Sequence, residues 1–301
     1  MLDDYDIGGL LGKGGFAHVY RGRKRGSGRE VAIKIVSRTH HRVIQNEIAL
    51  HQQCSHPNII QFMESFEDDA YTYIILECCK MNLFKYLKVT HILSELTSGY
   101  IIKQILTALE YLHSINILHR DIKLSNILIS AIHSREYCNI DVKLSDFGLA
   151  IQSHHPDEEQ FTLCGTPHYI APGMYSIIFI SFTNNSNNSS LEMIHQHAYS
   201  YPIDLWATGC VFYSLISGNL PSELNKDLAN IQLKLQLVLR SMSSTNFNIS
   251  EPALHFLSSL LQLVSFRLQS SYSLINSYYV GSFGPAECCG NSEPSLPSNY
   301  S

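Results

Sequence analysis

Two short motifs in the second half of the chain constrain its fold and its chemistry more than any other feature. The stretch ILHRDIKLSN, residues 117–126, has the pattern H-R-D-x-K-x-x-N, and the triplet Asp-Phe-Gly follows at residues 146–148. Each acidic or amide residue alone is equally typical of a loop cap or a turn. Chance does not explain their joint occurrence in this order, which indicates a site for phosphoryl transfer.

The motif residues have chemically distinct expected roles. Phosphoryl transfer depends on alignment and on neutralising negative charge, and needs little covalent help from the protein. We therefore expect Asp121 to orient the attacking hydroxyl or accept its proton. Asn126 and Asp146 are expected to hold magnesium between the phosphates, and Lys123 to screen the γ-phosphate.

A glycine-rich stretch near the start of the chain fits the same chemistry. In LGKGGFAHV, residues 11–19, Gly12 and Gly14 lack a Cβ and allow backbone N–H groups to approach anionic oxygens. Ala17 stands where a third glycine is common in a phosphate-covering loop. Alone, this stretch is equally typical of a tight hairpin.

A lysine in the next strand strengthens the case for a nucleotide site. Lys34 ends the sequence VAIK, and Glu47 lies in the first helical pattern at a separation that allows an ion pair. A lone strand lysine is usually solvated, whereas a paired one can be held toward the α- and β-phosphates. We expect the Lys34–Glu47 pair to have this role.

Hydrophobic patterning divides the chain into a β part and a helical part. Short runs broken by glycines at residues 5–12, 17–23 and 30–36 indicate an antiparallel meander, and two more strands end at Glu77. Helical patterns begin at Arg42 and span residues 98–115, where one stripe contains Ile101, Ile105, Leu109 and Leu112. The patterns predict an α+β fold with a small β-rich lobe at residues 1–79, containing one long helix, and a larger, mainly helical lobe at 80–280.

Composition narrows the function further. The net charge of −5 provides no basic surface for nucleic acid, and the longest apolar run, at residues 177–182, is too short to span a bilayer. Eight cysteines lack the spacing of a disulfide framework or a metal site, which indicates reduced thiols and a cytoplasmic or nuclear protein. The acidic N-terminus does not read as a signal peptide.

Three further segments have simple interpretations. The pairs His40-His41 and His154-His155 have no acidic or cysteine companions at ligand spacing, so we expect solvated loop or cap histidines. Residues 130–141 are expected to form a surface loop extension between two strands. Residues 281–301 are rich in Gly, Ser and Pro and are expected to lack order.

Over residues 5–280 the chain resembles the eukaryotic protein kinases, and within them the polo-like kinases of the Sak subfamily, which act in centriole duplication. The closer resemblance is in GKGGFAHVYRG, RVIQNEIALH, HPNIIQFMESFED and FTLCGTPHYIAP. It implies the bilobal protein-kinase fold, ATP and Mg²⁺ as cofactors, and serine or threonine in a protein as phosphate acceptor. It also implies a link to centriole duplication or the cell cycle.

The resemblance also implies roles for individual residues. The regulatory position is Thr162, otherwise an ordinary exposed threonine, and Arg120 is the cation that would receive its phosphate. Lys123 and Thr166 lie where selectivity for serine and threonine is usually set. The nucleotide is expected to contact Leu11, Gly12, Lys13, Gly14, Gly15, Phe16, Ala17, His18, Val19, Ala32, Lys34, Glu77, Cys79 and Leu128.

Two departures from the family pattern affect the functional interpretation. Polo-like kinases of this type continue into polo-box modules that direct localisation and dimerisation, whereas this chain stops at Ser301 without them. A centriolar or centrosomal location and the oligomeric state therefore stay open. The segment ECCKMNLFKYL, residues 77–87, is one residue shorter than in the family and lacks its glycine.

The largest departure begins at Gly173, which stands where the family has the glutamate of Ala-Pro-Glu. That glutamate pairs with a buried arginine, for which Arg267 is the candidate. Residues 173–175 can be encoded by GGT-ATG-TAT, which contains a splice-donor sequence, and residues 190–192 can be encoded by TCT-TTA-GAA, which contains an acceptor sequence. Removing residues 173–191 joins Pro172 to Glu192 and restores the motif. A retained intron is thus favoured over a genuine polar insertion.

Two classes of function remain for the chain as written. The first is a protein serine/threonine kinase, supported because Lys34, Glu47, Asp121, Asn126 and Asp146 are all chemically competent. The second is a pseudokinase or scaffold, or an inactive product of a mis-spliced gene, supported by Gly173 and the segment that follows.

Overall fold

The computed structural model describes residues 2–133, 139–153, 164–171, 201–220 and 249–261. Several expectations fall outside these ranges and stay predictions. They concern His154-His155, Thr162, residues 173–191 with Gly173, Glu192, Arg267 and the tail at 281–301.

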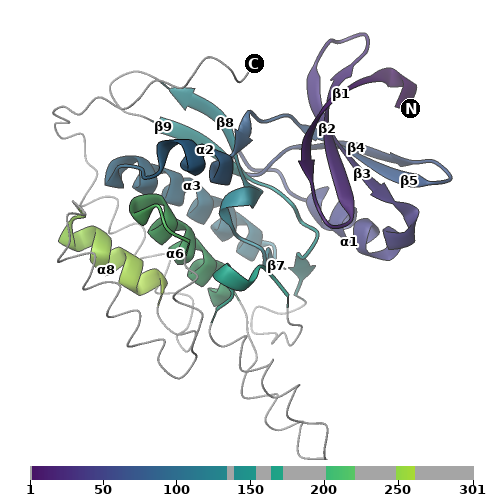
Figure 1. The fold of residues 1–301 in the computed structure, drawn as a ribbon. Helices are drawn as coiled ribbons and strands as arrows, with labels where there is room; N and C mark the ends of the chain where they lie inside the picture. Colours follow the sequence, from purple (N-terminus) through teal and green to yellow (C-terminus); the bar gives the residue numbers. More distant parts are fainter. Residues whose placement is uncertain (1, 134–138, 154–163, 172–200, 221–248, 262–301) are drawn as a thin grey trace, which may run out of the picture.

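The small lobe is built on a five-stranded antiparallel sheet, seen at the right of Figure 1. Its strands are β1 (Tyr5–Lys13), β2 (Ala17–Lys24), β3 (Glu30–Ser37), β4 (Phe62–Glu67) and β5 (Tyr71–Glu77), in the order β1-β2-β3-β5-β4. Short 3-10 turns at Leu2–Asp4 and Arg38–His40 flank the meander, and the long helix α1 (His41–His51) packs beside it. The predicted strands and helix of this lobe are confirmed.

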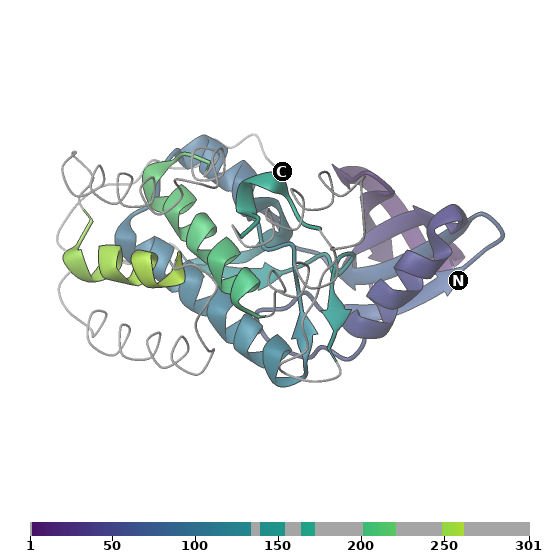
Figure 2. The same cartoon turned by 90° about the horizontal axis from the view of Figure 1, so that it is seen from below.

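The larger lobe is mainly helical. Its described helices are α2 (Leu83–Thr90), α3 (Glu95–Ser114), α6 (Pro202–Ser217) and α8 (Glu251–Leu260), with short 3-10 turns at Leu124–Asn126 and Pro167–Tyr169. Figure 2 shows α3 and α6 side by side, with α8 against α6. Two small sheets complete it, β6 (Met81–Asn82) with β8 (Ile127–His133) and β9 (Asn139–Leu144), and β7 (Ile117–Leu118) with β10 (Ile151–Gln152).

The predicted apolar stripe of α3 forms the centre of the larger lobe. Ile101, Ile105, Leu109 and Leu112 are all buried in one hydrophobic cluster with α6 and α8. The helix begins at Ser94, whose hydroxyl accepts a hydrogen bond from the Thr97 N–H and so satisfies a donor at the helix start. Burial of this stripe fixes which face of α3 meets the rest of the lobe.

Glycine permits the close approach of α6 and α8. A Cβ added at Gly209 would lie 2.8 Å from a side-chain carbon of Leu261 and 3.0 Å from the Leu260 Cβ. The contact at this point is therefore backbone against side chain. Any larger residue at position 209 would push the two helices apart.

The expectation of a surface loop at residues 130–141 is wrong for the residues that the structure describes. Strand β8 runs on to His133 and β9 starts at Asn139, with Ala131 opposite Asp141 and Ile132 opposite Ile140. Ile140 is fully buried, so apolar side chains continue the hairpin past the predicted strand ends. The apolar residues of this stretch pack as strand residues, although its overall composition is polar.

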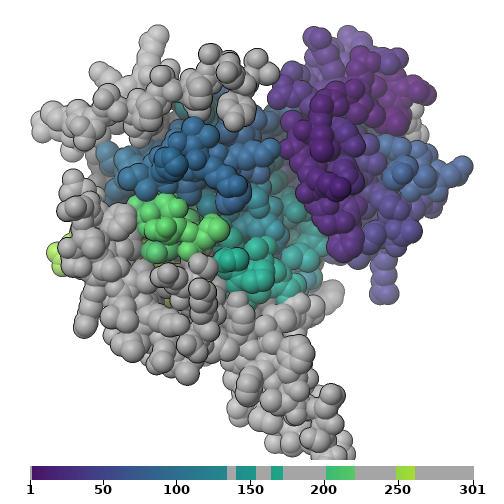
Figure 3. Space-filling view, in the orientation of Figure 1, coloured from purple at the N-terminus to yellow at the C-terminus, as the bar shows by residue number. Residues whose placement is uncertain are grey.

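The two lobes lie against each other in the space-filling view of Figure 3, with the purple small lobe beside the blue and teal larger lobe. The predicted lobe boundary at residues 79/80 falls in the link between β5 and β6. No helix in the described part of the chain has both the length and the apolar character needed to cross a membrane.

Candidate functional site

The Lys34 ammonium group, which was predicted to lie beneath the glycine-rich stretch, lies between two carboxylates. The Lys34 Nζ is 2.5 Å from Glu47 Oε1 and 3.0 Å from Asp146 Oδ1. Lys34 comes from β3, Glu47 from α1, and Asp146 from the segment after β9 in the other lobe. The fold therefore joins three residues that are far apart in the sequence.

These carboxylates determine the charge state of the site. Burial alone lowers the pKa of Lys34, but Glu47 and Asp146 outweigh it and raise the pKa above its ordinary value. Desolvation works against the charge of Asp146, yet Lys34 holds the pKa of this carboxyl below its ordinary value. At neutral pH the site therefore holds an ammonium beside an ionised, partly exposed Asp146.

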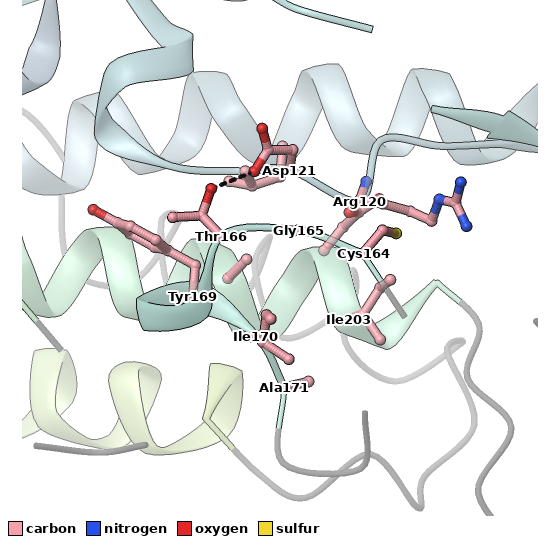
Figure 4. Close-up of a pocket in the computed structure, with 12 residues that line it drawn as sticks. Arg120, Asp121, Cys164, Gly165, Thr166, Tyr169, Ile170, Ala171 and Ile203 are labelled. Atoms are coloured by element: carbon pink, nitrogen blue, oxygen red, sulfur yellow. Dashed lines mark hydrogen bonds between the residues drawn. The ribbon is translucent and has the colours of Figure 1, made fainter. Parts of the chain in front are cut away.

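A second cluster surrounds Asp121 in the larger lobe. The Asn126 Nδ2 donates hydrogen bonds to the Asp121 Oδ2 at 2.9 Å and to its backbone oxygen at 3.0 Å. Lys123 Nζ lies 2.7 Å from Asp121 Oδ2 and donates to Thr166 Oγ1 at 2.9 Å. Thr166 Oγ1 in turn donates to Asp121 Oδ1 at 2.8 Å, the contact dashed in Figure 4. A carboxylate, an ammonium and a hydroxyl thus meet at one point.

A buried aspartate from α6 holds the backbone that carries Asp121. Asp204 Oδ2 accepts the His119 N–H at 3.0 Å, and Oδ1 accepts the Arg120 N–H at 2.8 Å. The His113 Nε2 on α3 lies 3.0 Å from Asp204 Oδ2. Burial favours the neutral acid, but His113 and the His119 N–H hold the pKa of Asp204 below its ordinary value. The ionised Asp204 side chain therefore holds the backbone of His119 and Arg120, directly before Asp121.

Backbone strain is concentrated in the same place. Arg120 has φ 64° and Asp146 has φ 68°, left-handed values that residues with a Cβ adopt at some energetic expense. Strain of this kind persists where surrounding contacts over-determine it. The bonds from Asp204 to the Arg120 N–H and from Lys34 to Asp146 supply such contacts.

The glycine-rich stretch forms the turn between β1 and β2. The Gly14 N–H donates to the Ala17 backbone oxygen at 2.8 Å, as a tight hairpin requires. A Cβ added at Gly12 or Gly15 would meet no atom within 4 Å, and neither has a positive φ. A side chain at either position would therefore not clash with the part of the protein that the structure describes.

Three of the residues expected to contact the nucleotide lie on strands from both lobes. Ala32 of β3 is buried and stands opposite Leu76 of β5, while Val19 of β2 stands opposite Lys34. Leu128 of β8 lies in the other lobe, opposite Lys143 of β9. Their joint contact with a nucleotide stays a prediction.

Contacts at the edge of this region link the two lobes. Lys85 Nζ on α2 donates to the Leu11 backbone oxygen on β1 at 3.1 Å. The Glu77 N–H is already donated to the Gln61 backbone oxygen at 3.0 Å. Glu77 also pairs with Val31 across β3 and β5, and Cys79, two residues further along the chain, is half-buried.

The remaining residues expected at the glycine-rich stretch lie at its surface. Lys13 pairs with His18 across the β1–β2 hairpin, and the Phe16 ring is 69% exposed. The Phe16 ring lies 4.4 Å from the ring of His40, measured between centroids. His40 was expected to be a solvated loop or cap residue, and it is a half-buried cap residue before α1 with this aromatic neighbour.

The other histidine of that pair has an acidic neighbour. The His41 Nε2 lies 3.5 Å from Glu67 Oε1 on β4, a residue distant in sequence. Ligand spacing along the chain could not reveal this contact. In the described residues no group of three or more His, Cys, Asp or Glu side chains could hold a metal ion.

The predicted regulatory pair is only half described. Arg120 Nε donates to the Leu149 backbone oxygen at 2.7 Å, which ties it to the segment that leads toward Thr162. Figure 4 shows the Arg120 guanidinium directed away from Thr166. Thr162 itself lies outside the described residues, so its contact with Arg120 stays a prediction.

Two buried histidines near the site were not singled out from the sequence. His113 lies beside Leu112 on the buried side of α3, and His51 lies one turn after Glu47 on α1. Both are polar residues within an apolar helical stripe, and this position in the sequence could have indicated that each has a buried hydrogen-bond partner. Their partners, Asp204 and the Ile60 carbonyl, come from the tertiary fold.

Comparison with known proteins identifies the family of this arrangement. Residues 5–280 match the protein kinase domain family. The chain is 34% identical over 272 residues to the serine/threonine-protein kinase PLK4 of Drosophila melanogaster, which covers 87% of this chain and 31% of that protein. It is 36% identical over 228 residues to the Aedes aegypti protein of the same name, which covers 73% of this chain and 26% of that protein. The chain thus spans less than a third of the length of these relatives.

Proposed function

The chain belongs to the protein kinase family, and we propose that it transfers the γ-phosphoryl group of ATP to serine or threonine hydroxyls in proteins. One observation carries the proposal: the Lys34 ammonium contacts both Glu47 and Asp146. This contact joins the strand, the helix and the metal-ligand candidate that phosphoryl transfer requires to be in place together. A scaffold would have no need of such an alignment.

The residues present fit magnesium and a nucleotide. Asn126 uses its Nδ2 as a donor to Asp121, which leaves its Oδ1 as the oxygen that could hold a metal. Asp146 is ionised, and hard oxygen ligands suit Mg²⁺, whose remaining ligands are commonly phosphate oxygens and water. When bound, Mg²⁺ would neutralise charge on the phosphates. Lys34 would hold the α- and β-phosphates under the glycine-rich turn.

Acceptor selectivity is proposed to come from the cluster around Asp121. Its carboxylate would orient the acceptor hydroxyl and take its proton, while Lys123 would screen the transferred group. Thr166 bonds to both residues and so fixes their separation. Lys123 and Thr166 lie where kinases of this family usually set selectivity for serine and threonine, which supports these residues as acceptors.

The test compares two substitutions in phosphate transfer to a generic serine/threonine substrate. Asp121→Asn removes the group that orients the hydroxyl, and Asp146→Asn removes a metal-ligand carboxylate. Each is expected to lower kcat at least about a hundredfold. MgATP should still raise the melting temperature of Asp121→Asn but not that of Asp146→Asn. Transfer at the wild-type rate by either variant would overturn the role assigned to that residue, whereas a wild type that transfers no phosphate would support the scaffold.

Regulation is proposed at Thr162, by its place in the sequence after the Asp-Phe-Gly motif. A phosphate there adds nearly two negative charges, which can order a loop against an arginine such as Arg120. Thr162→Ala is expected to reduce phosphate transfer several-fold while MgATP binding, measured by thermal shift, is unchanged. An unaltered transfer rate in this variant would remove the regulatory role.

A link to centriole duplication is proposed on the resemblance to Sak-type kinases. The matched relatives named PLK4 support this subfamily, although the chain covers less than a third of them. Imaging of the tagged full-length protein in its own cells tests the location. Absence from centrioles would leave the kinase proposal intact.

A further inference from the structure

One side chain of the larger lobe reaches the start of the glycine-rich stretch in the small lobe. The Lys85 Nζ on α2 donates a hydrogen bond to the Leu11 backbone oxygen on β1 at 3.1 Å. Lys85 is exposed, whereas the other lysine that joins the lobes, Lys34, contacts Asp146 from the interior. The lobes that Figure 3 shows side by side are therefore linked at their surface as well as inside.

A bulge in β1 makes the Leu11 carbonyl available to this lysine. Leu10 pairs with Tyr20 on β2 and Gly12 pairs with Val19, so the register passes over Leu11. A bulge leaves its extra residue without a partner in the ladder. β1 is also an edge strand of the described sheet, with β2 as its neighbour there. The backbone of Leu11 is thus free of strand pairing within this sheet, directly before Gly12.

The helix that carries Lys85 is fixed to the larger lobe. The Lys85 N–H donates to the Asn82 Oδ1 at 2.9 Å, which caps the start of α2. Asn82 stands opposite Leu128 on β8, and α2 packs against the turn Leu124–Asn126. Lys85 therefore lies on the same support as Asn126, a metal-ligand candidate, while Leu11 moves with the glycine-rich stretch.

We propose that Lys85 is a positioning residue whose bond to the Leu11 carbonyl is a clasp between the lobes. The clasp must break before the glycine-rich stretch moves away from α2 and lets a nucleotide enter or leave. This inference rests on nucleotide binding beneath that stretch, which is part of the proposed function.

The position of the clasp predicts how it acts on the two rates of nucleotide exchange. Both ends of the bond belong to the protein, so it holds the free and the nucleotide-bound forms alike. Its removal should lower the barrier to entry and to release equally and leave the affinity unchanged. A bond from Lys85 to the nucleotide itself would instead change the affinity, since only the bound form would lose it.

The experiment uses three variants of the 301-residue chain. Lys85→Met retains an unbranched stem and removes the donor, whereas Lys85→Arg retains a charged donor. Lys88→Met is the matched control, because Lys88 lies on the same helix and its Nζ is 4.6 Å from the ring centre of Phe84, also on α2. Both lysines are exposed, so the substitutions should preserve the fold, which thermal melting checks.

Nucleotide release is measured by stopped flow in the presence of Mg²⁺. Each protein is loaded with unlabelled ADP and mixed with an excess of a fluorescent ATP analogue. The rise in fluorescence then follows the departure of ADP and gives koff. Isothermal titration calorimetry gives Kd for MgADP, and kon is obtained from koff and Kd.

We expect Lys85→Met to raise koff and kon about fivefold each, as for the loss of one exposed hydrogen bond from a charged donor, with Kd within about twofold of the wild type. Lys85→Arg and Lys88→Met should stay within about twofold of the wild type in both rates. Unchanged koff in Lys85→Met, or equal koff in Lys85→Met and either other variant, would overturn the clasp. A raised Kd with unchanged kon would also overturn it, because Lys85 would then contact the nucleotide.

These measurements separate the clasp from the proposed kinase activity, because they require no phosphate transfer. A wild type that shows the expected difference from Lys85→Met, yet transfers no phosphate, would contradict the kinase proposal and support the clasp. A wild type that binds no MgADP would overturn both.

Discussion

At the scale of single residues, buried polar side chains determine the geometry of the site. Asp204 accepts two consecutive backbone N–H groups, and this arrangement offsets the strained φ of Arg120. His113 and His51 have similar structural roles on α3 and α1, each paired inside an apolar surrounding. A buried group without a partner is energetically costly, so such pairs specify one arrangement of the backbone.

The lowered pKa of His51 predicts a pH dependence of stability. The folded protein binds a proton at His51 near pH 4, whereas the unfolded chain binds one at the ordinary value of 6.5. Burial is the main cause; Lys34 and His119 add to it, while the Ile60 carbonyl and Asp146 oppose it. Within this window the unfolded chain holds more protons. The free energy of unfolding therefore falls as pH drops from 6.5 toward 4, and the His51 contribution is fully present only above 6.5.

The measurement is urea denaturation of wild type and His51→Gln at pH 7 and pH 5. At about 1.4 kcal/mol for each pH unit below 6.5, the wild type should lose ~2 kcal/mol more than the variant over this interval. Other titrating groups are common to both proteins and cancel in the difference. Equal losses would mean that His51 is not buried in its neutral form.

At the scale of elements, one glutamine joins α3 to strand β9. The Gln104 Nε2 donates to the Ile140 backbone oxygen at 2.9 Å, and its Oε1 accepts the Val142 N–H at 2.9 Å. The same oxygen accepts from Asn58 Nδ2, also at 2.9 Å. The side chain thus takes the place of a further strand beside β9, which ends close to Asp146. The position of the metal-ligand candidate therefore depends on a helix in the core of the larger lobe.

Removing this junction should destabilise the protein. Gln104→Leu leaves the Val142 N–H and the Ile140 carbonyl without their side-chain partner, and we expect about 2–4 kcal/mol of lost unfolding free energy in urea denaturation. Gln53→Leu is the control, because Gln53 is exposed and donates only to the Ala49 carbonyl from its amide. Its change should stay within about 0.5 kcal/mol. Similar values for the two variants would refute the role of Gln104.

At the scale of the whole molecule, the interruption after Pro172 is the main open feature. Trp206 on α6 is buried, and its Nε1 has no hydrogen-bond partner in the part of the chain that the structure describes. A buried indole N–H usually finds an acceptor. The same helix packs against the turn Pro167–Tyr169, close to Ala171, the last described residue before the interruption.

We predict that deleting residues 173–191, so that Pro172 precedes Glu192, raises both stability and phosphate transfer. The restored Glu192 would pair with Arg267, and breaking a buried pair of this kind removes about 3–5 kcal/mol. Arg267→Ala should therefore destabilise the deleted form strongly and the 301-residue form much less. Thermal melts and transfer assays on the four proteins measure this. No gain on deletion, or equal effects of Arg267→Ala, would identify residues 173–191 as a genuine part of the protein.

The sequence alone determined the order of strands and helices along the small lobe, the buried stripe of α3 and the motifs whose residues the structure brings together around Lys34 and Asp121. These features depend on local periodicity and on short motifs, which contiguous residues encode directly. The tertiary structure decided the rest, because it depends on contacts between distant segments. Packing of distant segments placed Asp204 against the Arg120 N–H, Gln104 beside β9 and the His51 ring against the Ile60 carbonyl. A polar residue in an apolar helical stripe signals that it has a buried partner, but only packing selects which partner it meets.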